Sequence, residues 1–337
     1  MNSERYSRQI LFAPIGRQGQ ERLAHSNVVI VGCGALGTVH ATLLARAGIG
    51  RLRLVDRDFV EESNLARQWL FEEEDAVQCL PKAVAAARRL RSINAEIQIE
   101  DSVADVMSRN VEELTRGFDL ILDGTDNFET RYLLNDVSVK HGVPWIYGAV
   151  VGSLGATMTI LPGRTACLNC VLPTLPSGAV ETCDTVGVIG PAVMWTASVQ
   201  VTEALKVLIG GKQDLHGFLL SYDIWNHQLH QLRPRKDPQC RACGQANFAY
   251  LRGATSHATV LCGRHAVQIR PPEPRALDLQ DLRKRLESAG SVRGNDYLLR
   301  CHLPRYEMTI FADGRAIFRG TDSESVARGL YAKYIGN

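Results

Sequence analysis

Short apolar runs alternate with amphipathic stretches over the first two thirds of the chain. Residues 27–31 (NVVIV) and 51–55 (RLRLV) are rich in branched side chains, which is typical of strands buried in a parallel sheet. Between them, Val39, Leu43 and Ala47 recur four residues apart, the spacing of a helix that buries one face. A strand, a helix and a second strand in this order are the building unit of a parallel sheet.

The same alternation continues as far as residue 208. Helices are expected over residues 82–90 and 193–208. Further strands are expected at 97–99, 119–122, 143–147 and 156–161. The pattern therefore predicts an α/β domain over residues 1–247, built on a doubly wound, mostly parallel, Rossmann-like sheet.

A second domain is expected after a linker at residues 244–258, which are rich in Gly, Ala, Ser and Thr. Beyond the linker the pattern predicts a strand at 259–269, a helix at 279–287, strands at 297–303 and 307–318, and a helix at 324–334. Asp313-Gly314 is a hairpin signal. Residues 258–337 therefore form a small α+β domain, to which the sequence assigns no role.

The charge balance narrows the classes of partner. The chain has 337 residues, with 38 Lys and Arg against 36 Asp and Glu, a net charge of +2. Proteins that bind polyanions through charge alone carry a larger excess, so we expect no nucleic-acid partner. The first 26 residues lack the apolar core of a secretory signal. The uncharged stretches 141–163 and 185–202 contain Gly and Pro, which favours buried segments over membrane spans. We therefore expect a cytoplasmic protein with no membrane partner.

A glycine-rich motif follows the first strand. Gly32, Gly34 and Gly37 form G-x-G-x-x-G and open the first helix. Such glycines permit a tight turn and a close approach of the backbone to a ligand, and the helix N-terminus offers amide donors to phosphate. Asp56 lies 19 residues beyond Gly37 at the end of the next strand, where a carboxylate can bond ribose hydroxyls. The pattern predicts a bound nucleotide, either NAD or ATP; a strand–helix turn without a ligand is the alternative.

Polar side chains at later positions favour ATP over NAD. The run 63–68 (SNLARQ) places Arg67 and other polar groups where a dehydrogenase needs only a plain crossover. Lys82 starts a helix and could reach the same phosphates. Asp123 and Asp126 follow another strand, so a carboxylate there is well placed to hold Mg²⁺ on a triphosphate. Singly, Arg67 could be a solvated ion-pair partner and Asp126 a helix cap, but their convergence on one sheet edge favours a site.

Four of the nine cysteines form two C-x-x-C pairs, Cys167 with Cys170 and Cys240 with Cys243. Four thiolates are the ligands of a closed, tetrahedral zinc site. Without an export signal, metal or thiol chemistry is favoured over a disulfide framework, with a redox pair or coincidence as alternatives. We therefore predict a structural zinc that joins two segments about 70 residues apart.

Cys183 lies apart from both pairs, after the Pro-rich stretch 173–178. A thiol in a loop near a nucleotide site can attack an activated carbonyl if its pKa is lowered. An unreactive loop thiol is the alternative reading.

Together these motifs resemble the ThiF/MoeB/HesA family, the bacterial relatives of ubiquitin-activating enzymes. The resemblance covers residues 4–247 and rests on RYSRQ at 5–9, GCGALG at 32–37, VDRDFVEESNLARQ at 55–68, Pro81-Lys82, DGTDN at 123–127 and both cysteine pairs. Gly124 departs from the cysteine that the family commonly has there. The resemblance implies ATP-dependent adenylation of the C-terminal glycine of a ubiquitin-like sulfur carrier ending in Gly-Gly, with release of pyrophosphate. The carrier can later become a thiocarboxylate.

The resemblance also implies roles for individual residues. Asp56 binds the ribose of ATP and Asp126 holds Mg²⁺. The other residues expected at the cofactor are Gly32, Gly34, Gly37, Asn64, Arg67, Gln68, Lys82, Asn127 and Arg131. Arg8 reaches across a homodimer into the partner's site, where it acts with Arg67, Lys82 and Asp126 in catalysis. Cys183 falls where thiamin-type members keep a cysteine for a persulfide or acyl-disulfide step.

Two alternative functions and one open question remain at this point. A family member could activate another carboxylate, on a peptide or a tRNA, and an NAD-dependent dehydrogenase with structural zinc would explain the glycines and the cysteines.

Sulfur would come from a separate donor, a cysteine desulfurase or a rhodanese. Residues 252–337 contain 14 Lys and Arg against 9 Asp and Glu, so the basic C-terminal domain could dock an acidic carrier or the donor, or could serve stability.

Overall fold

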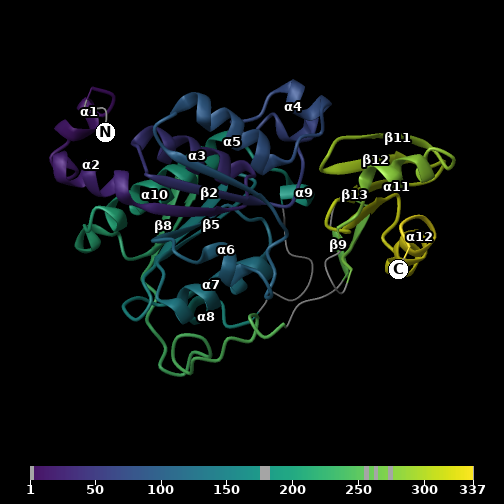
Figure 1. Cartoon of the computed structure of the whole chain (residues 1–337). Helices are drawn as coiled ribbons and strands as arrows, with labels where there is room; N and C mark the ends of the chain where they lie inside the picture. The colour runs from purple at the N-terminus through teal and green to yellow at the C-terminus, as the bar shows by residue number, and fades with distance from the viewer. Residues whose placement is uncertain (1–3, 175–182, 254–257, 262–264, 272–275, 337) are drawn as a thin grey trace. The chain divides into compact units, whose positions relative to one another are not determined.

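The computed structural model describes residues 4–174, 183–253, 258–261, 265–271 and 276–336, with no side-chain description for 183–184 and 258–261. The chain divides into two compact units (Figure 1). The first comprises residues 1–76 and 81–255, and the second comprises residues 77–80 and 256–337. Among the described helices, none combines the length and the apolar character that crossing a bilayer requires.

The first unit is built on an eight-stranded sheet, with the strand order β3-β2-β1-β4-β5-β6-β7-β8. Its strands are β1 (Asn27–Val31), β2 (Arg51–Asp56), β3 (Gln98–Val103), β4 (Leu120–Asp123), β5 (Trp145–Val151), β6 (Leu154–Ile160), β7 (Leu219–Asp223) and β8 (Gln228–Leu232). The pairs from β3 to β5 are parallel, and the pairs from β5 to β8 are antiparallel. The predicted parallel-rich α/β sheet is therefore confirmed. Only two residues join β5 to β6, too few for a parallel crossover.

Ten α-helices belong to the described part of this region. They are α1 (Ser7–Leu11), α2 (Gly16–His25), α3 (Ala35–Ala47), α4 (Glu73–Val77), α5 (Lys82–Ile93), α6 (Val111–Thr115), α7 (Phe128–His141), α8 (Leu168–Val171), α9 (Cys183–Val186) and α10 (Gly190–Leu208). Helix α3 ends where Gly48 adopts a left-handed conformation with φ +81°. Two short 3₁₀ turns span Glu62–Asn64 and Lys212–Asp214.

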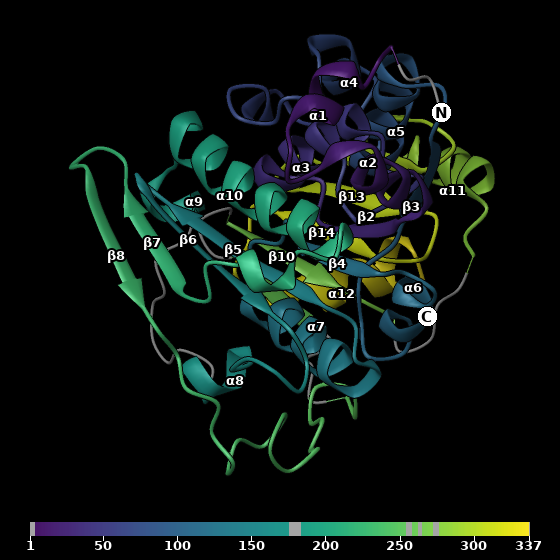
Figure 2. The same cartoon turned by 90° about the vertical axis from the view of Figure 1, so that its left-hand side faces the viewer.

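Helices cover both faces of the sheet (Figure 2). On one face, α3 and α10 pack against β5 through an apolar cluster that includes Val39, Val150 and Val193. On the other face, α7 packs through Tyr132 against a cluster that includes Trp145. Burying apolar side chains on both faces explains why the central strands are continuous apolar runs in the sequence.

The strand order reverses between β1 and β4, which carry their connecting helices to opposite faces. In open α/β sheets, ligands bind outside the carboxyl ends of the strands at such a switch point. The segments that follow β1, β2 and β4 begin at Gly32, Arg57 and Gly124. The fold therefore brings the glycine motif, the end of β2 and the DGTDN segment to one edge of the sheet.

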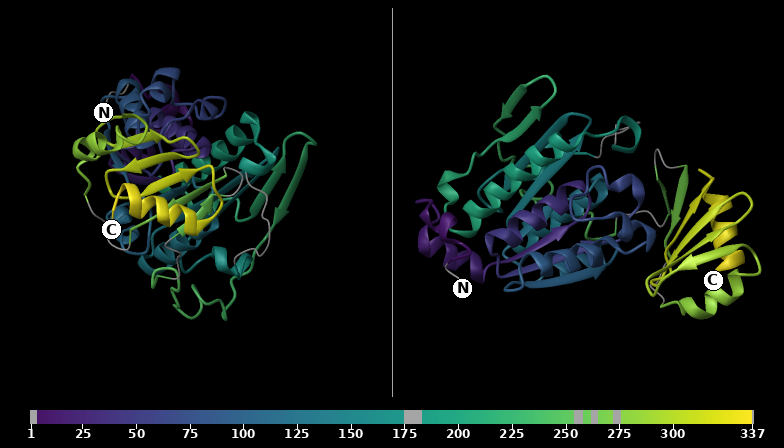
Figure 3. Two further views of the ribbon diagram at one scale, coloured as in Figure 1. Left: turned by 90° about the vertical axis from the view of Figure 1, so that its right-hand side faces the viewer. Right: turned by 90° about the horizontal axis from the view of Figure 1, so that it is seen from above.

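The second unit contains an antiparallel sheet with the order β11-β12-β13-β14-β10-β9 (Figure 3). Its elements are β9 (Ala258–Leu261), β10 (Ala266–Ile269), α11 (Leu279–Leu286), β11 (Ser291–Gly294), β12 (Leu298–His302), β13 (Glu307–Phe311), β14 (Ala316–Arg319) and α12 (Glu324–Tyr334). Helices α11 and α12 pack on one face through Leu282 and Tyr331, against Val267 and Phe318. The expected strand at 307–318 is instead the hairpin β13–β14, which turns at the Asp313-Gly314 signal.

Candidate nucleotide and metal sites

The glycine motif forms a tight loop between β1 and α3. Gly32 has φ +91°, and a Cβ there would overlap the carbonyl of Gly124 in the neighbouring loop. A Cβ at Gly37 would overlap the carbonyl of Gly32. Larger residues would therefore push the start of α3 away from the sheet. The loop leaves the N-terminus of a 13-residue helix at the sheet edge, where its amides can bind an anion.

Asp56 lies at the end of β2 beside this loop. Its Oδ2 accepts a hydrogen bond from the backbone N–H of Cys33 at 2.6 Å, and its Oδ1 accepts one from Asp58 at 2.7 Å. Burial raises the pKa of Asp56, and the nearby charge of Lys82 opposes that rise. Each carboxylate oxygen keeps a second acceptor position for a ligand hydroxyl. The carboxylate thus lies against the glycine loop, as ribose binding requires.

Lys82 is the first residue of α5 and is buried. Its Nζ lies 3.7 Å from Oδ2 of Asp58, and its backbone N–H donates to the carbonyl of Asp58 at 2.8 Å. The start of α5 is therefore fixed to the segment after β2. This brings a cation next to Asp56, at the edge of the sheet that carries the glycine loop.

The chain just after the SNLARQ segment is fixed to α3, because the backbone N–H of Trp69 donates to Oγ1 of Thr38 at 3.1 Å. Asn64 is buried and its Oδ1 accepts from the N–H of Glu61, which caps the 3₁₀ turn. Arg67 Nη1 donates to the carbonyl of Ser63 at 2.7 Å. Gln68 is 4% exposed, and its Oε1 has no hydrogen-bond partner within the described residues. A bound group that donates a hydrogen bond would satisfy this oxygen.

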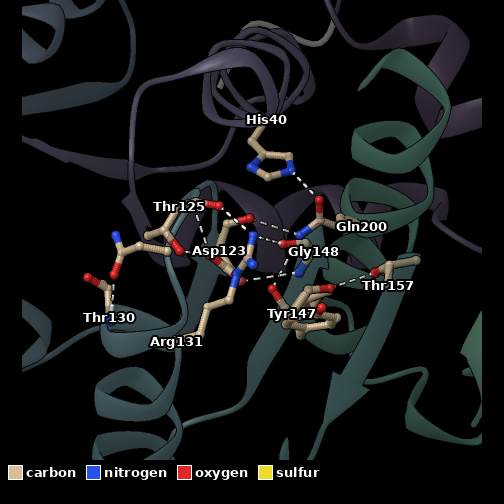
Figure 4. A network of polar contacts seen from close by, with 11 residues as sticks. His40, Asp123, Thr125, Thr130, Arg131, Tyr147, Gly148, Thr157 and Gln200 are labelled. Atoms are coloured by element: carbon tan, nitrogen blue, oxygen red, sulfur yellow. Dashed lines mark hydrogen bonds and ion pairs between the residues drawn. The ribbon is translucent and has the colours of Figure 1, made fainter. Parts of the chain in front are cut away.

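Asp123 organises the DGTDN loop from inside the protein (Figure 4). Its fully buried carboxylate accepts from the N–H and Oγ1 of Thr125 at 2.9 and 2.7 Å, and pairs with Nε of Arg131 at 3.3 Å. Arg131 Nη2 in turn donates to the carbonyls of Thr125 and Gly148. Burial raises the pKa of Asp123, and Arg131 opposes the rise. The described contacts of Arg131 therefore hold the loop in shape.

Asn127 and Asp126, two further polar residues of this loop, differ in their contacts. Asn127 caps α7, because its side chain accepts from the N–H of Thr130 at 2.9 Å. Asp126 is exposed, and its carboxylate makes no hydrogen bond to the part of the chain that the structure describes. An exposed carboxylate at a strand end is a suitable oxygen donor for a hard cation such as Mg²⁺.

Arg57 is a further cation near Asp126 that the sequence analysis did not select. It pairs with Asp105 at 3.1 Å and lies 3.8 Å from Asp58. Burial alone would lower the pKa of Arg57, but the charges of Asp105, Asp58 and Asp126 more than offset burial and raise it. Its position between two acids in VDRD was the available signal.

The four cysteines of the two C-x-x-C pairs come together. All four Sγ atoms lie within 4.8 Å of one another, with Cys167 and Cys240 at 3.6 Å and Cys170 and Cys243 at 3.4 Å. Four thiolates around a tetrahedral zinc, each about 2.3 Å from the ion, lie about 3.8 Å apart. The cluster therefore has the size and ligand chemistry of such a site. It joins the chain after β6 to the chain after β8.

A comparison with known protein families finds a match over most of the chain. The model of the ThiF family matches residues 6–242. The chain belongs to the ThiF family. The family resemblance expected from the motifs is thereby confirmed, and support for the dehydrogenase alternative is removed.

Two related proteins and one solved structure show the extent of the similarity. A relative from Bacillus subtilis (strain 168), named sulfur carrier protein ThiS adenylyltransferase, is 46% identical over 98% of this chain and 99% of its own length. A Thermus thermophilus sulfur carrier protein adenylyltransferase is 39% identical over 72% of this chain and 90% of its own. The structure of E. coli MccB matches with a TM-score of 0.64 and 23% identity, covering 72% of this chain and 73% of that one. This last similarity concerns the fold.

Two residues that the ThiF motifs select lie outside the geometry described so far. Arg8 is exposed on α1. Cys183 is the first residue of α9, and its side chain lies outside the described residues. The segment between α9 and α10 is fixed to the end of β5, because the N–H of Gly152 donates to Gly187 and Ile189 donates back to Gly152.

His40, a fully buried residue of α3, makes stability depend on pH. Burial lowers the pKa of His40 to about 4, opposed by a hydrogen bond with Gln200. As pH falls below about 6.5, the histidine of the unfolded chain takes up a proton that folded His40 does not, so acid favours unfolding. We expect this residue to cost about 3 kcal/mol of stability between pH 6.5 and 4.

Urea unfolding of the wild type and of His40→Gln across this pH range isolates the effect, since other buried acids titrate in both proteins. The difference in unfolding free energy between the two should change by the stated amount. An unchanged difference would contradict a buried, neutral His40.

Proposed function

We propose that this chain catalyses the ATP-dependent adenylation of the C-terminal glycine of a ubiquitin-like sulfur carrier, with release of pyrophosphate. One observation carries the proposal: the ThiS adenylyltransferase of B. subtilis matches 98% of the chain at 46% identity, including the second unit. The convergence of the glycine loop, Asp56 and Asp126 at one sheet edge supports the same function. We further propose residues 1–247 as the adenylation domain and 258–337 as a separate domain.

The arrangement of residues at the sheet edge supports nucleotide binding there. The amides at the N-terminus of α3 would bind phosphate, and Asp56 would accept hydrogen bonds from the ribose. Lys82 is held nearby by Asp58. Arg67 would exchange its contact with the Ser63 carbonyl for phosphate oxygens, a charge-assisted and therefore stronger hydrogen bond. Attack of a carboxylate on the α-phosphate needs alignment and charge neutralisation more than covalent help, and these cations supply both.

Asp126 is the residue that we propose for Mg²⁺. Its exposed carboxylate offers the oxygen ligand that this cation prefers. When bound to the triphosphate, Mg²⁺ would neutralise the charge that builds up as pyrophosphate leaves. The buried Asp123 is committed to Thr125 and Arg131, so it fixes the loop that presents Asp126.

The four-cysteine cluster fits a structural zinc. Its sulfur–sulfur distances match a tetrahedral thiolate site, and all four ligands are protein side chains, which leaves no open position for catalysis. We propose that zinc ties residues 167–170 to residues 240–243 and thereby closes the end of the first unit.

A second copy of the chain and a sulfur donor complete the proposed cycle. Leu11 and Phe12 are 72% and 59% exposed close to Arg8 in the sequence. Two apolar side chains at this exposure support contact with another protein surface. We propose that a homodimer covers these side chains and places Arg8 in the partner's site. Cys183 would act after adenylation, when a cysteine desulfurase or a rhodanese supplies sulfur. We place the reaction in the cytoplasm.

ATP–pyrophosphate exchange tests the function. The enzyme would be incubated with Mg²⁺–ATP, labelled pyrophosphate and a panel of small carriers ending in Gly-Gly, including the ThiS type. We expect exchange with one carrier and none when its terminal glycine is deleted. Absence of exchange with every carrier, despite measurable ATP binding, would contradict the proposed acceptor.

A further inference from the structure

Gln200 is a residue of α10 that no motif selects. It makes hydrogen bonds close to the sheet edge where the nucleotide would bind (Figure 4). It is fully buried. Its Nε2 donates to the carbonyl of Asp123 at 3.1 Å and to the carbonyl of Ile146 at 3.3 Å. Its Oε1 lies 2.8 Å from Nε2 of His40. One carboxamide therefore joins α10 to β4, β5 and α3.

The contact with the strands falls where β4 and β5 stop pairing. Their register runs from Ile121 opposite Trp145 to Leu122 opposite Ile146. Gln200 bridges the carbonyls of the next residue in β4 and of the last paired residue in β5. It thus fixes the spacing of the two strands at the point where the DGTDN loop begins.

The chain leaves space for this bridge. A Cβ on Gly148 of β5 would overlap the Gln200 carboxamide. Gly148 also accepts from Arg131 and donates to Asp123, so the Gln200 bridge and the Asp123–Arg131 pair share one residue. A substitution at Gln200 would therefore alter the position of the DGTDN loop in two ways, through the lost bond to the Asp123 carbonyl and through a shift of β5.

The contact with His40 extends the bridge to the glycine loop. Because Gln200 Nε2 donates to two carbonyls, its Oε1 faces His40 as an acceptor, so His40 must donate from Nε2. His40 lies one turn beyond Gly37, in the helix whose N-terminus would bind phosphate. Low dielectric strengthens these hydrogen bonds and makes their loss costly.

We propose that Gln200 is a positioning residue for the nucleotide, which holds the glycine loop and the DGTDN loop at the spacing that Mg²⁺–ATP requires. The inference rests on the proposed function for the identity of the nucleotide. Gln200 touches neither loop's candidate ligand groups; it acts through the backbone of Asp123 and through α3.

The test is the affinity of Gln200→Met for Mg²⁺–ATP, measured by calorimetry on the full chain without any carrier. Methionine keeps the length of the side chain but removes both donors and the acceptor. We expect the Kd for Mg²⁺–ATP to rise about 10- to 100-fold, a factor comparable to the loss of rate that a misplacement near 1 Å causes. In exchange assays kcat should fall by a similar factor, with the KM for the carrier within about twofold of wild type.

Thr196→Val is the matched control. Thr196 is buried one turn earlier on α10, where its Oγ1 bonds to the carbonyl of Ala192 in its own helix and faces Gly155. The Thr196→Val substitution should lower the unfolding temperature with no change in ATP affinity. Gln200→Glu, which keeps the shape and in its protonated form one donor, should lie between wild type and Gln200→Met, and remains informative if the methionine variant does not fold.

The outcomes separate the two claims. If both Gln200 variants lose only stability, with ATP affinity per folded molecule equal to wild type, the positioning role is wrong. If wild type binds Mg²⁺–ATP but exchanges pyrophosphate with no carrier, the proposed acceptor is wrong, and the comparison of ATP affinities still decides the role of Gln200.

Discussion

Replacing Asp126 with alanine is expected to reduce carrier adenylation by about 100- to 1,000-fold while the protein stays folded. The physical reason is the loss of the carboxylate that we propose for Mg²⁺, and metal neutralisation of a triphosphate supplies several kcal/mol of transition-state stabilisation. The side chain is exposed and makes no hydrogen bond to the described residues, so its removal should cost little stability. Initial rates of ATP–pyrophosphate exchange at saturating ATP give the effect directly.

A matched control removes an exposed carboxylate away from the sheet edge. Glu113→Ala on α6 should leave exchange unchanged, which shows that a lost surface charge is not sufficient. Raising the Mg²⁺ concentration should recover part of the lost rate in the Asp126 variant. Retained turnover in Asp126→Ala at ordinary Mg²⁺ would overturn the magnesium assignment, whatever the state of the other residues.

Loss of the cysteine cluster is expected to have the largest effect on stability. In Cys240→Ser the proposed zinc would lose one of four ligands that hold together segments far apart in the chain. Zinc binding contributes about 10–16 kcal/mol in isolated structural sites, so a loss of about 5 kcal/mol and a fall of about 10–20 °C in unfolding temperature are expected. Hydrogen exchange should accelerate first in residues 161–174 and 233–251.

Cys301→Ala provides the comparison, because Cys301 is buried in the hydrophobic core of the second unit and is not one of the four clustered cysteines. It should cost about 1 kcal/mol and leave the zinc content at one ion per chain. Elemental analysis of wild type and both variants reads out the metal. Wild-type protein without bound metal, or unchanged exchange around residue 240 in the serine variant, would contradict a structural zinc.

The sequence predicted where the candidate residues lie in the fold, but it did not predict the direction of their side chains. Asp56 and Asp126 follow strands whose carboxyl ends share an edge, so strand prediction alone placed them near the glycine loop. Asn127 and Arg131 belong to the same motif, yet Asn127 caps α7 and Arg131 pairs with the buried Asp123. Spacing in the sequence places a residue at an edge, but the direction of its side chain depends on which buried groups need a partner.

Features that lack a pattern of apolar residues had no indication in the sequence. All five residues of β8 are exposed, so the strand at the edge of the sheet leaves no buried face for the sequence to display. Gln200 lies in a helix of mostly small and apolar residues, where one polar side chain gives no sign of the carbonyls it will meet. Within the second unit, by contrast, the Asp313-Gly314 signal correctly indicated where the expected strand at 307–318 divides, because Gly314 with φ +85° reverses the chain between β13 and β14.

We propose that this chain transfers AMP from ATP to the C-terminal carboxylate of a sulfur carrier. The intact mass of the carrier, after incubation with the enzyme, Mg²⁺ and ATP, shows whether this transfer occurs. We expect the carrier to gain the mass of one adenylyl group at its terminal glycine, and to gain none when that glycine is deleted. An unmodified carrier in a reaction that releases no carrier-dependent pyrophosphate would contradict this proposal.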